Sequence, residues 1–126
     1  MCYPLFFYWI KKMNVTRTPP KHITCPIAFV NASTLGANTV LAAPGAGACI
    51  RVLSMALVST GANAVKFQSA STDISATWPL AANGGLVLPY NEHGWFQTAA
   101  NEALNVNLGT ATATGVHIQY IIVGAP

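Results

Sequence analysis

The sequence has very few charged residues. Nine of its 126 side chains belong to Asp, Glu, Lys or Arg, which is 7% of the chain, whereas roughly 25% is usual for a soluble globular domain. A folded monomer of this mass exposes roughly 6,400 Å² of surface, so there is about one charge per 700 Å². An isolated monomer normally needs a more charged surface to resist association. The composition therefore predicts a subunit whose surface is largely covered by other protein.

The few charges are also unevenly placed along the chain. Four of the six basic residues precede residue 22, namely Lys11, Lys12, Arg17 and Lys21. From residue 22 onward, two basic and three acidic residues give a net charge of −1. The body therefore lacks a basic patch large enough to hold a nucleic-acid duplex.

Cysteine and long apolar runs are scarce as well. Cys2, Cys25 and Cys49 are an odd, widely spaced set without a Cys-x-x-Cys pair, which excludes a disulfide framework and a zinc motif of that kind. We expect them to be reduced, small apolar side chains. No apolar run approaches the roughly 20 residues that cross a bilayer, so no membrane partner is expected.

Groups for acid–base chemistry are equally few. The acids of the body are Asp73, Glu92 and Glu102, and their spacing favours no catalytic pair. A serine-nucleophile motif and a phosphate-binding loop are missing too. The sequence therefore predicts a protein that is not an enzyme, with no catalytic residues and no cofactor.

Glu92-His93 is the one place where an acid adjoins an imidazole. A metal site might be built from Glu92, His93 and His117, or from one histidine of each subunit on a symmetry axis. Neither a His-x-His nor a Glu-x-x-His motif accompanies these residues. We favour a turn whose polar groups bond to its own backbone, and we predict no metal site.

The first 26 residues differ from the rest. Residues 1–12 are rich in aromatic side chains, and they are either a docking peptide or, as we favour, an extension upstream of a natural start at Met13. Pro19, Pro20 and Pro26 follow, and proline disfavours helix here. We expect residues 1–26 to be an extended N-terminal arm and residues 27–126 to be one domain.

The domain has the periodicity of β-strands. Leu104, Val106 and Leu108 alternate with two asparagines, and Val116 begins a similar run to Ile122. In the run Ile50–Val58 the phase of the apolar residues shifts midway, which indicates a bulge or a strand covered on both faces. The other expected strands lie at 27–30, 39–41, 65–68, 73–80, 86–88 and 94–98.

About eight strands at 10–12-residue spacing, separated by Gly, Pro and Asn turns, predict an all-β fold. We expect a single antiparallel β-sandwich, jelly-roll-like, with an immunoglobulin-like sandwich as the alternative.

Several side chains are candidates for an interface between subunits. Aromatic residues in the middle of the chain are expected in the core or at such an interface, where each buries about 150–250 Å². A sugar-stacking platform of Trp78, Tyr90 and Trp95 is the alternative. The candidate interface residues are Arg51, Lys66, Trp78, Tyr90, His93, Trp95 and Phe96.

Parts of the chain resemble small structural proteins of tailed bacteriophages. The resemblance covers about residues 35–123 and rests on segments 40–47, 50–53, 64–67, 79–85, 94–98 and 102–108. Ala48 and Cys49 stand where that family often has Arg or Lys-Arg. The resemblance implies a β-sandwich of the virion, such as a capsid decoration or cement protein, and brings no catalytic residues.

We therefore expect a virion structural protein, assembled in the host bacterial cytoplasm, that docks on a major capsid or tail protein. It is expected to self-associate, with a trimer as one option. The basic arm is either a solvated tail or reaches an acidic capsid patch or packaged DNA. The alternative function is a tail-tip or fibre-head module that recognises a host surface glycan.

Overall fold

The computed structural model describes residues 26–125, whose regular structure is entirely β-strand. The predicted arm, residues 1–26, lies outside the described residues except for Pro26. The strands are β1 (Ile27–Ala32), β2 (Gly36–Leu41), β3 (Ala48–Ser59), β4 (Asn63–Ser69), β5 (Thr72–Asp73), β6 (Trp78–Leu80), β7 (Gly85–Leu88), β8 (Phe96–Gln97), β9 (Leu104–Leu108) and β10 (Thr114–Gly124).

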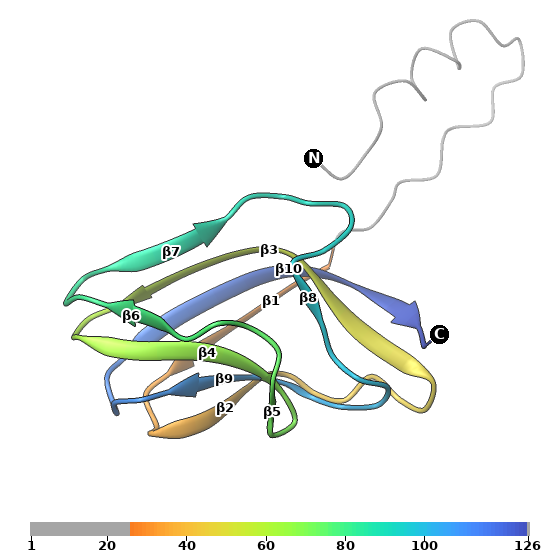
Figure 1. Cartoon of the computed structure of the whole chain (residues 1–126), viewed down its shortest axis with the longest axis horizontal. Helices are drawn as coiled ribbons and strands as arrows, with labels where there is room; N and C mark the ends of the chain where they lie inside the picture. Colours follow the sequence, from red (N-terminus) through yellow and green to blue (C-terminus); the bar gives the residue numbers. More distant parts are fainter. Residues whose placement is uncertain (1–25, 126) are drawn as a thin grey trace, which may run out of the picture.

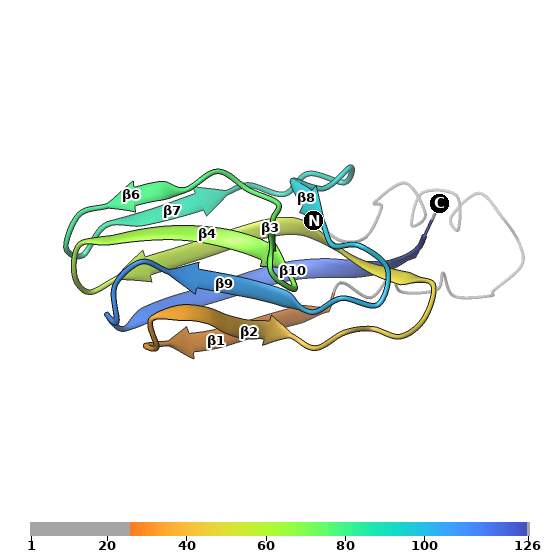
Figure 2. The same cartoon turned by 60° about the horizontal axis from the view of Figure 1, so that its bottom comes forward.

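The strands form two antiparallel sheets that pack face to face as two layers (Figures 1 and 2). Sheet A has the order β1-β10-β3-β7, and β8 also pairs with β3. Sheet B has the order β2-β9-β4-β5, and β6 also pairs with β4. The predicted all-β sandwich is confirmed.

The pairing pattern is that of a jelly roll. β7 and β8 pair with successive parts of β3, so they form one interrupted edge strand, and β5 with β6 does the same beside β4. The sandwich thus has eight strands in effect, four in each sheet. β1 pairs with β10, β2 with β9, β3 with β7 and β8, and β4 with β5 and β6. This is a long antiparallel ribbon folded over on itself, the jelly-roll arrangement.

The core lies between the sheets and is built from their alternating inward side chains. Val52, Phe67, Leu104, Val106 and Ile118 are completely buried. The clean alternation predicted for residues 104–108 is confirmed, because the leucines and the valine of β9 point inward while its asparagines do not. Burial of this apolar surface is the main stabilising term.

The phase shift predicted within β3 is a β-bulge. Gln119 of β10 lies opposite Ser54 and Tyr120 lies opposite Val52, which leaves Leu53 as the extra residue. At this end β3 is also covered on its outer side, since Cys49 and Leu53 are buried as well. Both parts of that prediction are therefore correct.

Two predicted strands are shorter than expected. The segment 73–80 is broken into β5 and β6, and the segment 94–98 is reduced to the two residues of β8. In both places the backbone leaves the edge of the sheet as a loop. The alternation of apolar and polar residues does not predict where such a loop begins.

Candidate functional site

The outer side of sheet A carries an exposed apolar surface. Alternation along the strands turns every second side chain away from the core, and on sheet A most of these outward side chains are apolar or small. We call this surface the apolar face; it consists of Ile27, Phe29, Asn31, Ser54, Ala56, Val58, Gly85, Val87, Gly115, His117 and Gln119. Its largest apolar side chains are 55–70% exposed, namely Val58 55%, Ile27 58%, Phe29 66% and Val87 70%.

The strand register gives the apolar face its shape. Phe29, His117, Ala56 and Val87 lie opposite one another in a single row across β1, β10, β3 and β7. Large side chains stand on the two edge strands, whereas the central strand β3 contributes only an alanine to this row. The surface is therefore slightly hollowed along its middle.

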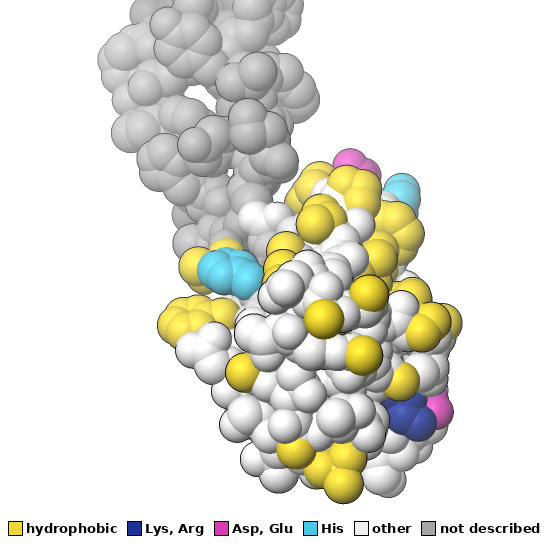
Figure 3. Space-filling view, turned by 90° about the vertical axis from the view of Figure 1, so that its left-hand side faces the viewer, with side chains coloured by type: hydrophobic (Ala, Val, Ile, Leu, Met, Phe, Trp, Pro, Cys, Tyr) yellow, Lys and Arg dark blue, Asp and Glu magenta, His cyan; other side chains and the backbone are white. Residues whose placement is uncertain are grey.

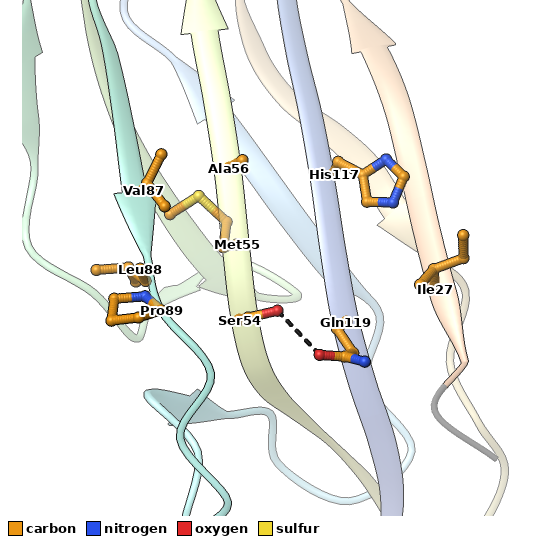
Figure 4. Close-up of a pocket in the computed structure, with 9 residues that line it drawn as sticks. All are labelled: Ile27, Ser54, Met55, Ala56, Val87, Leu88, Pro89, His117 and Gln119. Atoms are coloured by element: carbon orange, nitrogen blue, oxygen red, sulfur yellow. Dashed lines mark hydrogen bonds between the residues drawn. The ribbon is translucent and has the colours of Figure 1, made fainter. Parts of the chain in front are cut away.

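A shallow hollow of about 410 Å³ occupies this part of the apolar face. In Figure 4 the side chains that line it come from all four strands, with Val87 and Pro89 on one flank and Ile27 on the other. Its lining contains no Asp, Glu, Lys or Arg. A small-molecule site usually combines an apolar hollow with convergent polar groups, and this lining has few of them.

The polar side chains of the apolar face contact other residues of the same face. The Ser54 hydroxyl donates to Gln119 Oε1 at 3.2 Å, as Figure 4 shows. The His117 ring is stacked on Phe29, with centroids 6.0 Å apart and planes 16° from parallel. Docking of a protein here would thus bury no Asp, Glu, Lys or Arg side chain of this face.

The outer side of sheet B is polar by contrast. Lys66 and Asp73 form an ion pair of 3.0 Å, the only one among residues 26–125. Gln68 Nε2 donates to Asp73 Oδ1 at 2.8 Å, and Asn107 Nδ2 donates to Gln68 Oε1 at 3.1 Å. These hydrogen bonds from Gln68 and Lys66 lower the pKa of Asp73 below its ordinary value of 3.8. The two outer sides of the sandwich therefore differ sharply in character.

The space-filling view shows that charged side chains are scarce at one end of the molecule (Figure 3). Hydrophobic and uncharged polar groups cover most of the described surface there, and charged side chains occupy only two places near its margin (Figure 3). This agrees with five charged side chains after residue 25.

The loop 89–95 is held against β3 and presents two exposed aromatics. Asn91 N donates to Leu53 O at 2.9 Å, and Trp95 N donates to Val52 O at 2.8 Å. Asn91 also closes the turn, because its Oδ1 accepts from His93 N. The predicted turn that satisfies its own backbone is confirmed. Its ordered backbone leaves the Tyr90 and Trp95 side chains 41% and 43% exposed.

The structure divides the other candidate interface residues between core and surface. Trp78 and Phe96 pack against Phe67 in the core, with ring centroids 6.2 and 5.0 Å from its ring. The partly buried Trp78 thus packs on Phe67 of sheet B, whereas Tyr90 and Trp95 belong to the loop 89–95, which is bonded to β3 of sheet A. Of the seven candidate interface residues, Trp78 and Phe96 therefore pack against the core, which was one of the two locations expected for the aromatic side chains.

The basic candidates have local partners. Arg51 Nε donates to Gln97 Oε1 at 2.9 Å, beside the loop 89–95. Lys66 is held by Asp73 on the outer side of sheet B. These two residues therefore lie on different surfaces and do not form one contact patch.

Metal-ligating side chains do not gather within residues 26–125: no group of three or more His, Cys, Asp or Glu could hold an ion. Glu92 and His93 are exposed in the loop 89–95, while His117 lies on the apolar face. Cys49 is buried and unpaired, as expected of a small apolar side chain. Cys2 and Cys25 lie outside the described residues.

Sequence reasoning missed the large side chains of the apolar face: Ile27, Phe29, Val58 and Val87. A signal was present, because Ile27-Ala28-Phe29-Val30 is apolar on both phases of a strand. Such a run indicates a strand whose second side also needs cover.

Comparisons with protein-family models, with curated proteins and with solved structures gave no match to the chain. Within residues 26–125, no helix is long and apolar enough to span a membrane.

Proposed function

We propose that the protein is a non-enzymatic structural subunit of a tailed-bacteriophage virion, of the decoration or cement kind. It acts by associating with further copies of itself and by docking on a capsid or tail surface. The observation that carries the proposal is the apolar face, a hollowed surface of four strands without a charged side chain.

The apolar face is suited to binding another protein. Burying apolar area contributes about 25 cal/mol per Å², and a docking partner would not have to remove water from an Asp, Glu, Lys or Arg side chain here. Ser54 and Gln119 already bond to each other, so the polar groups need few new partners. Charge-poor cores with aromatic side chains are typical of protein–protein interfaces.

The assignment to a virion rests on the sequence resemblance to bacteriophage structural proteins. Jelly rolls are common in viral capsid domains, which is compatible with the proposal, although a fold alone does not define a function. The glycan-binding alternative is less well supported, since Trp78 packs in the core beside Phe67.

The apolar face alone would make a small interface. Four strands about 4.8 Å apart, over six residues of about 3.4 Å each, outline roughly 400 Å². A stable interface buries about 800 Å² on each partner. Docking would therefore gain from many copies that bind together.

The test uses the full chain and the phage that encodes it. Mass spectrometry of gradient-purified particles should detect the protein at a fixed ratio to the major capsid or tail protein. Added full chain should co-sediment with particles that lack it, and Val87→Lys should weaken this binding. Absence from the particles, together with no co-sedimentation, would refute the proposal.

A further inference from the structure

The two sides of the sandwich end in very different edge strands. On one side the edges are interrupted: β5 and β8 have two residues each, β6 contains Pro79, and the loop 89–95 separates β7 from β8. Short, broken or proline-containing edges resist pairing with another chain. The opposite side ends in β1 and β2, each of six residues.

β1 is the more regular of these two long edges. It pairs with β10 without interruption over all six residues. β2 has a register shift between Thr39 and Leu41, and Asn38 Nδ2 donates to Gly36 O at 3.0 Å. The register of β2 is therefore irregular and one of its carbonyl groups accepts from a side chain of the same strand, whereas the register of β1 is unbroken.

The hydrogen-bonding groups at the outer edge of β1 can be identified from the register. Pro26 O accepts from Tyr120 N at 3.0 Å, and bonded residues alternate along an antiparallel pair. Residues 28, 30 and 32 therefore direct their N–H and C=O groups to β10. Ile27, Phe29 and Asn31 direct theirs to the outer edge, where β1 has no strand partner among residues 26–125.

The side chains of β1 are also compatible with pairing. The strand contains no charged residue and no proline, so it lacks the usual devices that prevent edge-to-edge contact. Ala28 and Val30 face the core but remain half-buried, unlike Val116 and Ile118 on the neighbouring strand, which are 2% and 0% exposed. The core is thus incompletely covered along this edge.

We propose that β1 pairs antiparallel with β1 of a second copy, about a twofold axis at Phe29. This inference rests on the proposed function and identifies the partner in self-association. A twofold interface places each group against its own copy or a symmetric one, so any charge at its centre would repel itself. β1 carries none, which favours a second copy as the occupant.

The pairing follows from the axis at Phe29. Ile27 lies opposite Asn31 of the second copy, Phe29 opposite its own copy, and Asn31 opposite Ile27 of the second copy. All three residues direct N–H and C=O groups outward, so six main-chain hydrogen bonds form. The two apolar faces then join into one surface of eight strands, twice the area available for docking on a capsid.

The first experiment compares two lysine variants of the full chain by sedimentation velocity. Phe29 and Val87 stand at opposite edges of the apolar face and are similarly exposed, at 66% and 70%. Phe29→Lys sets two ammonium groups against each other at the axis and removes an aromatic pair. We expect it to raise the dimer dissociation constant about ten-fold or more, while Val87→Lys leaves it unchanged. Circular dichroism checks that both variants fold.

The second experiment is cross-linking through position 29. Residues of a hydrogen-bonded antiparallel pair have Cα atoms about 5.5 Å apart, within the range that a disulfide spans. Oxidised Phe29→Cys should therefore yield a dimer whose disulfide maps to position 29 of both chains. Val87→Cys, the matched control, should not cross-link through position 87. Peptide mapping separates these products from any formed by Cys2 or Cys25.

The outcomes distinguish the edge pairing from the proposed function. If the chain dimerises but only Val87→Lys dissociates it, self-association uses the apolar face; the edge pairing is then wrong and the proposed function stands. A chain that is monomeric yet binds particles also overturns the edge pairing alone. A monomer that ignores particles overturns both. Dissociation by Phe29→Lys alone, with the position-29 disulfide, supports the pairing.

Discussion

Replacing Phe67 by alanine should lower the free energy of unfolding strongly, because this residue belongs to the core and not to the surface available for association. The Phe67 side chain is completely buried between the sheets. The centroids of the Trp78 and Phe96 rings lie 6.2 and 5.0 Å from the centroid of its ring. Removing a buried phenylalanine ring costs about 3–5 kcal/mol. A domain of this size has a total stability of about 5–15 kcal/mol, so a large part of it would be lost.

The matched variant is Val87→Ala on the apolar face. Because this side chain is 70% exposed, its removal should change the free energy of unfolding by no more than about 0.5 kcal/mol. Phe67→Ala should lower the urea midpoint by at least about 1 M and the melting temperature by at least about 12 °C.

The assay is urea denaturation followed by circular dichroism, at two protein concentrations because association adds concentration-dependent stability. If Phe67→Ala lowered the free energy of unfolding by less than about 1 kcal/mol, the result would contradict the described packing of the core. An equal loss for Val87→Ala would mean that the apolar face is part of the monomer's fold and not a free surface.

Two further changes test local features. Gly94 has φ +83°, and an added Cβ would lie 2.5 Å from Arg51 Cγ. Gly94→Ala should therefore lower the free energy of unfolding by about 1–2 kcal/mol. Urea denaturation measures this loss, and an unchanged midpoint would contradict the prediction. Hydrogen bonds from Gln68 and Lys66 lower the pKa of Asp73 below 3.8, so their stabilising effect is present above pH 3.8 and is lost as the pH falls through the lowered pKa. The stability difference between wild type and Asp73→Asn should accordingly shrink between pH 6 and pH 2.5, and a difference independent of pH would show that the carboxylate has no such role.

Much of the fold could be predicted from local periodicity. β9 was predicted residue for residue because its alternation is unbroken, and the bulge at Leu53 left a visible phase shift in β3. The break between β5 and β6, and the pairing of β7 and β8 with successive parts of the same strand β3, could not be predicted. They depend on loops such as 89–95 that bond to a strand distant in sequence.

The candidate site was harder to predict, because periodicity tells which residues share a side of a strand but not which side is buried. Trp95 and Phe96 are neighbours, so they point in opposite directions, and only Trp95 is exposed. Phe29 and Val87 come from distant strands that the sheet order brings onto one surface. That juxtaposition arises from strand order, which the sequence did not reveal.

The proposed function requires that another protein covers the apolar face in the assembled particle. Carbene footprinting of the full chain, free at low concentration and bound to phage particles, tests it most directly. Labelling at Phe29, Val58 and Val87 should fall at least several-fold on binding, whereas labelling around Lys66 on sheet B should stay the same. Equal labelling of the apolar face in the free and bound protein would contradict the account.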